Sequence, residues 1–278
     1  MALDSAIEWT DATWNPVTGC TKVSPGCKFC YAERLTERFG LQAFSEIRLH
    51  PDRLSLPLRW RTPRRIFVNS MSDLFHERVP SGFINQVFDV MAQAPQHVFQ
   101  VLTKRSERLL AWRQSVRSGS IPAHIWLGVS VESASYLLRL DHLRQADVAV
   151  RFMSAEPLLG PLTGLNLEGI AWVITGGESG GPPERALVEA TTRGLRPKAD
   201  GLRWVREIRE LCRTQGVAFF HKQWGGRTAK AGGRVLDGRE WSEYSAFYGV
   251  PDARRDQAPM RHGGVPSGVA WLRMNVKP

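Results

Sequence analysis

The sequence has little of what an exported or membrane protein needs. No apolar run approaches the roughly 20 residues that a membrane-spanning helix requires. The first residues, MALDSAIEWTDATW, lack the basic segment followed by an apolar segment that marks a signal peptide. There is also no internal repeat and no low-complexity segment. We therefore expect a soluble, cytoplasmic protein that has no membrane partner.

Cysteine is scarce as well, with four in 278 residues. Four cysteines are enough for two disulfides, but Cys27 and Cys30 are separated by only two residues. That spacing favours metal or redox chemistry in a reducing compartment over a disulfide framework.

The overall composition indicates a globular protein with an excess of positive charge. Hydrophobic residues make up 42 % of the chain, so a sizeable core can form, and the length is typical of one barrel-type α/β domain. Lys and Arg number 37 against 27 Asp and Glu, a net charge of +10. This charge suits a nucleotide, nucleoside or nucleic-acid partner, because each neutralised phosphate releases counterions. On charge alone, it is equally open that the protein binds no nucleic acid or nucleotide.

Short apolar runs alternate with amphipathic segments along most of the chain. Near-continuous apolar runs are typical of parallel strands that are buried on both faces. Six such runs predict strands, at 66–71, 98–103, 125–131, 148–154, 171–177 and 217–224. Helical patterns lie between them, at 82–94, 105–115, 133–145 and 201–215, and Gly216 predicts the end of the last helix. This alternation predicts repeated βαβ units.

Nearly every predicted strand ends in polar, reactive residues: NSMSD, LTKR, SVE, SAEP, TGGES and HKQW. Barrels gather such residues at the C-terminal mouth of their strands, where active sites lie. We therefore predict an α/β fold with a partial or closed parallel (β/α) barrel of the TIM-barrel type over residues 1–225. The glycine-rich, charged segment 226–278 is predicted to be a loop-and-hairpin appendage that packs on the barrel.

The most informative stretch is residues 18–32, TGCTKVSPGCKFCYA, which spaces Cys20, Cys27 and Cys30 as C-x6-C-x2-C. Thiolates this close together repel one another, so such a group normally holds a metal that neutralises it. The sequence therefore predicts a metal-binding loop on these three cysteines.

Two kinds of metal centre remain open at this point. A structural zinc site needs a fourth ligand, which His50 or His76 could supply. An iron–sulfur cluster held by three cysteines instead leaves one iron open for an external ligand. Cys212 is predicted to be a core residue, because it lies on an apolar helical stripe.

The CKFCYA end of the loop, with a helix expected directly after it, resembles the radical S-adenosylmethionine superfamily, in which a three-cysteine loop follows the first strand of a partial α/β barrel. The first gap of six residues departs from that superfamily's usual C-x3-C-x2-C. A longer gap can still bring the three cysteines together, because the entropic cost of loop closure rises little with each added residue. The resemblance implies a 4Fe-4S cluster, S-adenosylmethionine bound at the open iron, and a 5′-deoxyadenosyl radical. It also implies an electron donor such as a flavodoxin or a ferredoxin.

The whole chain also resembles a narrower group, the phage-associated three-cysteine family, a domain of unknown function. The resemblance spans about residues 7–240 and rests on the motifs IEWTDATWNPVTGC, RIFVNSMSDLFH, FQVLTKR, WLGVSVE, RFMSAEPLLG, WVITGGESG and FFHKQWG. Membership implies no activity by itself.

Polar residues at two strand ends are candidates for binding S-adenosylmethionine. Gly176, Gly177 and Glu178 are similar to the Gly-Gly-Glu motif that holds the methionyl amino group in the superfamily, but they follow about the sixth strand instead of the second. A glycine-rich turn with a solvated glutamate is the alternative. Ser70 and Asp73 occupy the second-strand position, where Asp73 could equally cap a helix.

Two further strand ends each carry a serine and a glutamate on one face of the strand, namely Ser130 with Glu132 and Ser154 with Glu156. Buried carboxylates need partners, and Lys104 and Lys222 are natural ones. A structural lattice of ion pairs is therefore the alternative to contacts with a ligand. The same two lysines are our candidates for catalytic groups.

Two functions follow from these patterns. The first is a radical S-adenosylmethionine enzyme that modifies a nucleoside, nucleotide or nucleic acid. The alternative is a zinc-stabilised, non-catalytic nucleic-acid-binding protein. The glutamates at the strand ends favour the enzyme, because a phosphate-binding surface would not be lined with carboxylates.

Overall fold

The computed structural model describes residues 4–40, 43–115, 119–192 and 194–245. Seven strands form one parallel sheet in the order β1-β4-β5-β6-β7-β8-β11. Their bounds are β1 (Ala12–Trp14), β4 (Arg65–Val68), β5 (Val98–Thr103), β6 (Ile125–Ser130), β7 (Arg151–Ala155), β8 (Trp172–Gly176) and β11 (Ala218–Gln223). The order in the sheet follows the order in the chain, so the sheet winds in one direction into a half-barrel, as predicted, and is not doubly wound.

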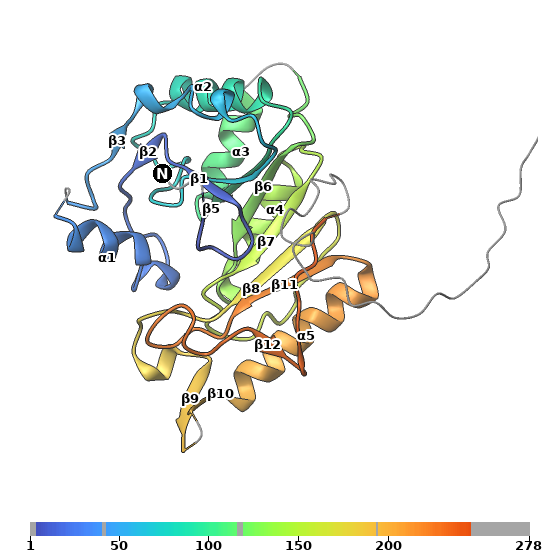
Figure 1. Cartoon of the computed structure of the whole chain (residues 1–278). Coiled ribbons are helices and arrows are strands. Elements are labelled where there is room, and N and C mark those ends of the chain that lie inside the picture. The colour runs from blue at the N-terminus through green and yellow to red at the C-terminus, as the bar shows by residue number, and fades with distance from the viewer. Residues whose placement is uncertain (1–3, 41–42, 116–118, 193, 246–278) are drawn as a thin grey trace, which may run out of the picture.

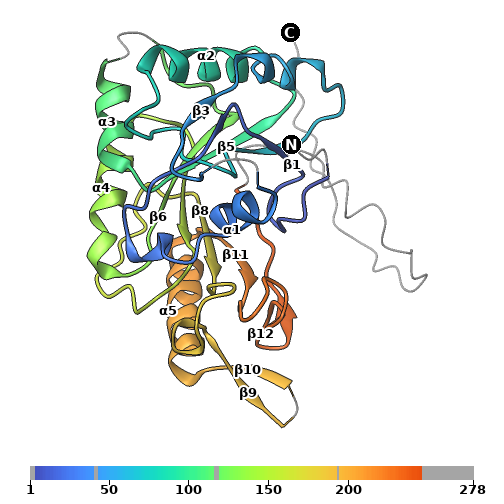
Figure 2. The same cartoon turned by 90° about the vertical axis from the view of Figure 1, so that its left-hand side faces the viewer.

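The helices lie on two sides of this sheet. Four of them cover its outer face: α2 (Ser81–Ala92), α3 (Ser106–Ser115), α4 (Leu138–Arg144) and α5 (Ala199–Gln215) (Figures 1 and 2). Helix α1 (Tyr31–Arg38), directly after the cysteines, lies on the opposite side. Helix α5 ends where predicted, because Gly216 adopts the left-handed conformation with φ 66°.

The predicted strands and helices are all present, with shifted ends. β4 stops at Val68 because Asn69 turns the chain with φ 60°, and β7 begins only at Arg151 after a turn at Asp147, with φ 44°. The predicted helix 133–145 is divided into a short 3-10 turn, η4 (Ala134–Tyr136), and α4. Strand β1, of three residues, and the hairpin of β9 (Val188–Thr191) and β10 (Gly194–Pro197) were not predicted from the sequence.

Large aromatic side chains fill the concave face of the half-barrel. Trp172 lies at the centre, with its ring centroid 5.7 Å from that of Trp126, 5.5 Å from Phe152 and 6.1 Å from Trp9. Phe67 and Phe220 complete this buried aromatic cluster. Because rings occupy the middle of the half-barrel, a ligand has room only at the C-terminal ends of the strands.

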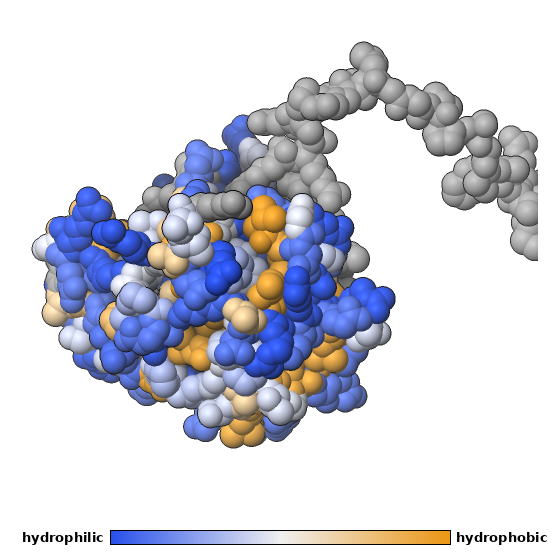
Figure 3. Space-filling model, turned by 90° about the horizontal axis from the view of Figure 1, so that it is seen from below, coloured by the Kyte–Doolittle hydropathy of each residue, from blue (hydrophilic) through white to orange (hydrophobic). Residues whose placement is uncertain are grey.

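The described part of the C-terminal segment packs against the sheet. Strands β12 (Val235–Leu236) and β13 (Arg239–Glu240) form a hairpin, and Asp237 at its turn pairs with Arg206 and Arg209 of α5. Residues 246–278 of the predicted appendage lie outside the described residues. Seen from below, this end of the molecule is mostly hydrophilic, with smaller hydrophobic areas between (Figure 3). None of the helices within the described ranges is long and apolar enough to span a membrane.

Replacing Gly128 with Ala should destabilise the fold by about 1–3 kcal/mol, because the added Cβ would meet the Phe152 ring at 2.5 Å inside the half-barrel. Urea unfolding measures this change. Gly82→Ala is the matched control: a Cβ there meets nothing within 4 Å, so it should be neutral or stabilise the helix by about 0.4–1 kcal/mol. Equal stability of the two variants would contradict close packing around Gly128.

Candidate functional site

A cavity of about 550 Å³ opens at the C-terminal ends of the sheet strands. All three clustered cysteines, Cys20, Cys27 and Cys30, contribute to its wall. The predicted strand-end residues that also line it are Ser70, Asp73, Lys104, Ser130, Ser154, Glu156, Gly177, Glu178 and Lys222. Two of the predicted site residues, Glu132 and Gly176, do not line this cavity.

The cysteines lie in the loop that leads from β2 (Val17–Thr18) to α1. Gly19 has φ 87°, and a Cβ there would collide with the backbone oxygen of Glu46, so only glycine fits immediately before Cys20. Cys27 ends a 3-10 turn, η1 (Pro25–Cys27), and Cys30 immediately precedes α1. All three side chains are half-buried. Cys212 is fully buried on α5 and lies in the core, away from the cavity.

Among the described residues, the cysteines do not form a ready-made site for a single metal ion. Within the described residues, no group of three or more His, Cys, Asp or Glu side chains lies close enough to share one ion. The imidazoles of His50 and His76, the possible fourth zinc ligands, hydrogen-bond to Thr18 and Thr21, both at 2.8 Å. Zinc binds thiolate sulfurs at about 2.3 Å and imidazole nitrogens at about 2.0–2.1 Å, whereas an iron–sulfur cluster binds each thiolate at a separate iron.

Arg105, which follows β5, ties the beginning of the cysteine loop to the sheet. Its guanidinium donates to the Cys20 Sγ at 3.5 Å and to the backbone oxygen of Thr21 at 3.0 Å. It also pairs with the buried Asp73, which accepts a hydrogen bond of 2.7 Å from Thr103. Burial and the Asp73 carboxylate raise the pKa of Cys20 to about 12, and Arg105 opposes this shift.

Glu178 is engaged in a bidentate ion pair. The Arg185 Nε and one terminal nitrogen donate to its two carboxylate oxygens, both at 2.6 Å, and the same guanidinium donates to the backbone oxygen of Pro25 in the cysteine loop at 2.9 Å. The preceding Gly177 leaves room for the backbone of Trp224, which a Cβ there would hit. Glu178 therefore faces the cavity while it also connects the end of β8 to the loop.

The remaining carboxylates form the ion-pair lattice that was the alternative interpretation of the strand ends. Glu132 is fully buried. Its carboxylate accepts hydrogen bonds of 2.7 Å from Arg139 and from Ser24 of the cysteine loop, and the Lys104 ammonium lies 3.6 Å away. Lys222 pairs with Glu156 at the cavity wall. Both lysines reach the cavity already paired, and their predicted catalytic role stays a prediction.

Four polar atoms in the cavity wall are buried and have no hydrogen-bond partner within the described structure. They are the Trp9 Nε1, the Asn69 Nδ2, the Ser154 Oγ and the Gln223 Oε1. Leaving a buried polar group unpaired costs about 1–3 kcal/mol, so such groups mark positions where a polar ligand is expected. The sequence analysis named Ser154 as a site residue, whereas it included Gln223 only as part of the polar strand end HKQW.

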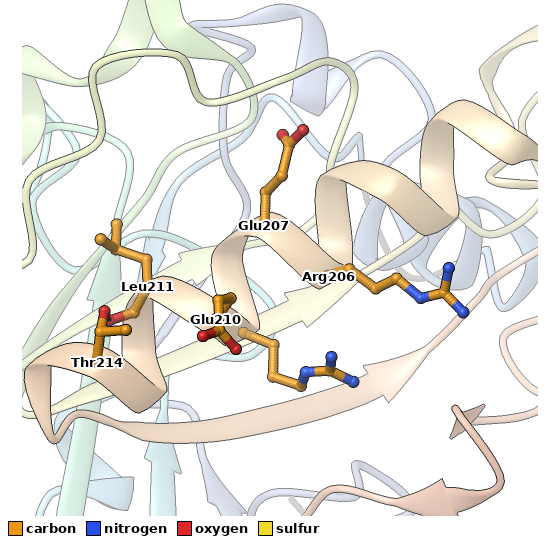
Figure 4. A pocket seen from close by; sticks show the side chains of 6 residues that line it. Arg206, Glu207, Glu210, Leu211 and Thr214 are labelled. Atoms are coloured by element: carbon orange, nitrogen blue, oxygen red, sulfur yellow. Dashed lines mark hydrogen bonds between the residues drawn. The ribbon is translucent and has the colours of Figure 1, made fainter.

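A second depression, of about 530 Å³, runs along the outer face of α5 and is lined by that helix alone (Figure 4). Its charged side chains are paired, Arg206 and Arg209 with Asp237 and Glu210 with Arg213. It therefore offers no free charge around which a ligand site could be built.

The fold and the site define a parallel half-barrel with a three-cysteine loop at its open end. The chain belongs to the family described as "Protein of unknown function (DUF5131)", which matches residues 4–245. This confirms the predicted membership in a family of unknown function, whereas the association with phages stays an expectation. No curated protein matches the chain.

Two solved structures have a similar arrangement. One is a cysteine-to-serine mutant of spore photoproduct lyase, with a TM-score of 0.49 and 11 % identity over 80 % of this chain and 79 % of that chain. The other is spore photoproduct lyase complexed with dinucleoside spore photoproduct, with a TM-score of 0.44 and 11 % identity over 74 % of each chain. Similarity at this level assigns no activity to the present chain.

Replacing Glu132 with Gln should destabilise the protein by about 3–5 kcal/mol, because Arg139 would be left as a buried charge without its partner. Chemical unfolding followed by circular dichroism measures the loss. Glu207→Gln, which removes an exposed i,i+4 partner of Arg203, is the control and should change stability little. A small loss in both variants would mean that the lattice around Glu132 does not support the fold.

Proposed function

We propose that this protein is a radical S-adenosylmethionine enzyme that modifies a nucleoside, nucleotide or nucleic acid. The observation that carries the proposal is that Cys20, Cys27 and Cys30 share one cavity with the polar strand ends of a parallel half-barrel. No observation favours the zinc-stabilised alternative: the Nε2 atoms of His50 and His76 are hydrogen-bonded to the hydroxyls of Thr18 and Thr21.

The three thiols would hold a 4Fe-4S cluster by three of its irons and leave one iron for S-adenosylmethionine. When bound, the reduced cluster would supply one electron that cleaves the C5′–S bond of S-adenosylmethionine, giving methionine and a hydrogen-abstracting 5′-deoxyadenosyl radical. The electron would come from a donor such as a flavodoxin or a ferredoxin. The chain's own contribution is to hold these groups in register and to keep water away from them.

The cavity wall offers groups that match S-adenosylmethionine, which carries an ammonium, a carboxylate, ribose hydroxyls and a base. Glu156 and Glu178 are carboxylates suited to the ammonium or to a hydroxyl pair. The unpaired atoms of Asn69, Ser154 and Gln223 can donate to or accept from the remaining polar groups. These residues lie on four different elements, so one extended ligand would reach several strand ends.

The floor of the cavity is suited to reactive chemistry. Trp9, Phe67 and Leu102 line it from the aromatic side of the half-barrel and exclude water from below. Lys230 lines the cavity wall, as does Lys22, which is paired with Glu33. The net charge of +10 supports an anionic, phosphate-bearing substrate.

Anaerobic reconstitution with iron and sulfide should give a brown protein that holds about four irons per chain, as a 4Fe-4S centre requires. Cys20→Ala, Cys27→Ala and Cys30→Ala should each lose the visible absorption and most of the iron. Cys212→Ala is the matched control and should keep both, because its thiol is fully buried away from the cavity. Iron lost in the control, or kept in any of the other three variants, would contradict this assignment.

Replacing Glu178 with Gln should weaken the binding of S-adenosylmethionine roughly ten- to a hundred-fold, the effect of losing one charge-assisted hydrogen bond of about 1.5–3 kcal/mol. Calorimetric titration of the reconstituted protein without oxygen measures the affinity. Glu184→Gln, on the neighbouring turn but outside the cavity wall, is the control. Unchanged affinity in Glu178→Gln with full iron content would leave Glu178 only its structural pair with Arg185 and move the ligand's ammonium to another carboxylate.

A further inference from the structure

Arg105 is a buried arginine whose contacts converge on the first cysteine of the loop. Its side chain is 4 % exposed. One terminal nitrogen donates to the Cys20 Sγ at 3.5 Å and to the Asp73 carboxylate at 3.3 Å, and the other donates to the backbone oxygen and the hydroxyl of Thr21, both at 3.0 Å. Its Nε donates to Glu77 at 2.9 Å. Every nitrogen of the guanidinium is therefore used, which fixes its plane and its distance from the sulfur.

The position of Arg105 in the fold is rigid. The residue lies two positions after the end of β5, and its backbone N–H donates to the Thr103 hydroxyl at 2.9 Å. Asp73 is held in turn by the Thr103 hydroxyl and by the backbone N–H of Lys104 and of Phe75. This network gives the guanidinium one orientation, with an N–H aimed at a thiol that also lines the cavity.

We propose, on the basis of the proposed cluster, that Arg105 is a positioning residue that sets the reduction potential of the metal centre through its N–H···S bond to Cys20. Hydrogen bonds to the ligating sulfurs, net charge and solvent exposure determine the potential of an iron–sulfur cluster. Reduction adds one negative charge to the cluster. A donor and a positive charge at the sulfur stabilise that charge, so Arg105 raises the potential and eases the arrival of the electron.

Neighbouring groups do not supply the same effect. Among the described residues, Arg105 makes the sole arginine or lysine hydrogen bond to any of the three cysteine sulfurs. Arg185 reaches the loop at the Pro25 backbone oxygen, and Lys22 is paired with Glu33. In the part of the chain that the structure describes, the hydrogen-bond partner of the Cys27 sulfur is the Ser24 hydroxyl, 3.7 Å away.

The test is a redox titration of the reconstituted protein with dithionite and mediator dyes, followed by the electron paramagnetic resonance signal of the reduced cluster. Arg105→Met should lower the equilibrium constant for one-electron reduction about tenfold, which corresponds to a midpoint potential about 59 mV lower. Arg105→Lys keeps the positive charge but loses the planar set of guanidinium N–H donors. The midpoint potential of the cluster in this variant should therefore lie between those in Arg105→Met and in the wild type.

Arg108→Met is the matched control. Arg108 lies in the first turn of α3, three residues after Arg105. It donates hydrogen bonds to the backbone oxygens of His76 and Val79, and among the described contacts it has none to a cysteine sulfur. Its loss removes the same charge from the same region and should leave the potential near that of the wild type.

The outcomes separate this proposal from the proposed function. A wild-type protein that binds no iron–sulfur cluster overturns both. If the wild type binds a cluster but Arg105→Met and Arg105→Lys have the midpoint potential of the wild type, only the role of Arg105 is overturned. The same holds if Arg108→Met lowers the midpoint potential as much as Arg105→Met does. If Arg105→Met takes up no iron, Arg105→Lys decides, and a failure of both to take up iron would assign Arg105 to folding of the loop and contradict the proposal.

Discussion

The site depends on holding a long, irregular loop over the open end of a half-barrel. A loop that spans from Gly19 to Cys30 has little secondary structure of its own, so its order comes from contacts with the sheet below. The strand ends supply these contacts as charged groups: Arg105 reaches Thr21, Glu132 accepts from Ser24, and Arg185 reaches Pro25. Charge-assisted hydrogen bonds suit this task, because they are stronger and more directional than apolar packing.

This constraint explains why several strand-end residues serve the loop as well as the cavity. A buried carboxylate is stable only with its partners satisfied, so Glu132 binds Arg139 and Ser24 beneath the loop and leaves no oxygen for a ligand. Glu178 is different: its carboxylate lines the cavity while its charge is balanced by Arg185 from the side. The aromatic cluster below limits how deep a ligand can reach, so a bound ligand would lie in the layer between the rings and the cysteines.

The fold was largely predictable because parallel strands buried on both faces leave long apolar runs in the sequence. β1 was missed because three residues are too short to give such a run, and the β9–β10 hairpin because its strands are mostly exposed. The spacing of Cys20, Cys27 and Cys30 was enough to predict that the three belong to one site. The role of Arg105 could not be predicted, because arginines are mostly exposed and only the tertiary fold brings this one to a sulfur 85 residues away in the chain.

The late position of the Gly-Gly-Glu motif follows from the same geometry. In a half-barrel whose strands follow chain order, the first and the last strands face each other across the open end, so a loop after β2 can reach the end of β8 directly. Arg185 makes that connection, with Glu178 on one side of its guanidinium and Pro25 on the other. A cationic ligand that draws on the Glu178 carboxylate must therefore share it with Arg185. Binding of such a ligand at Glu178 would therefore be coupled to the position of the cysteine loop through this one ion pair.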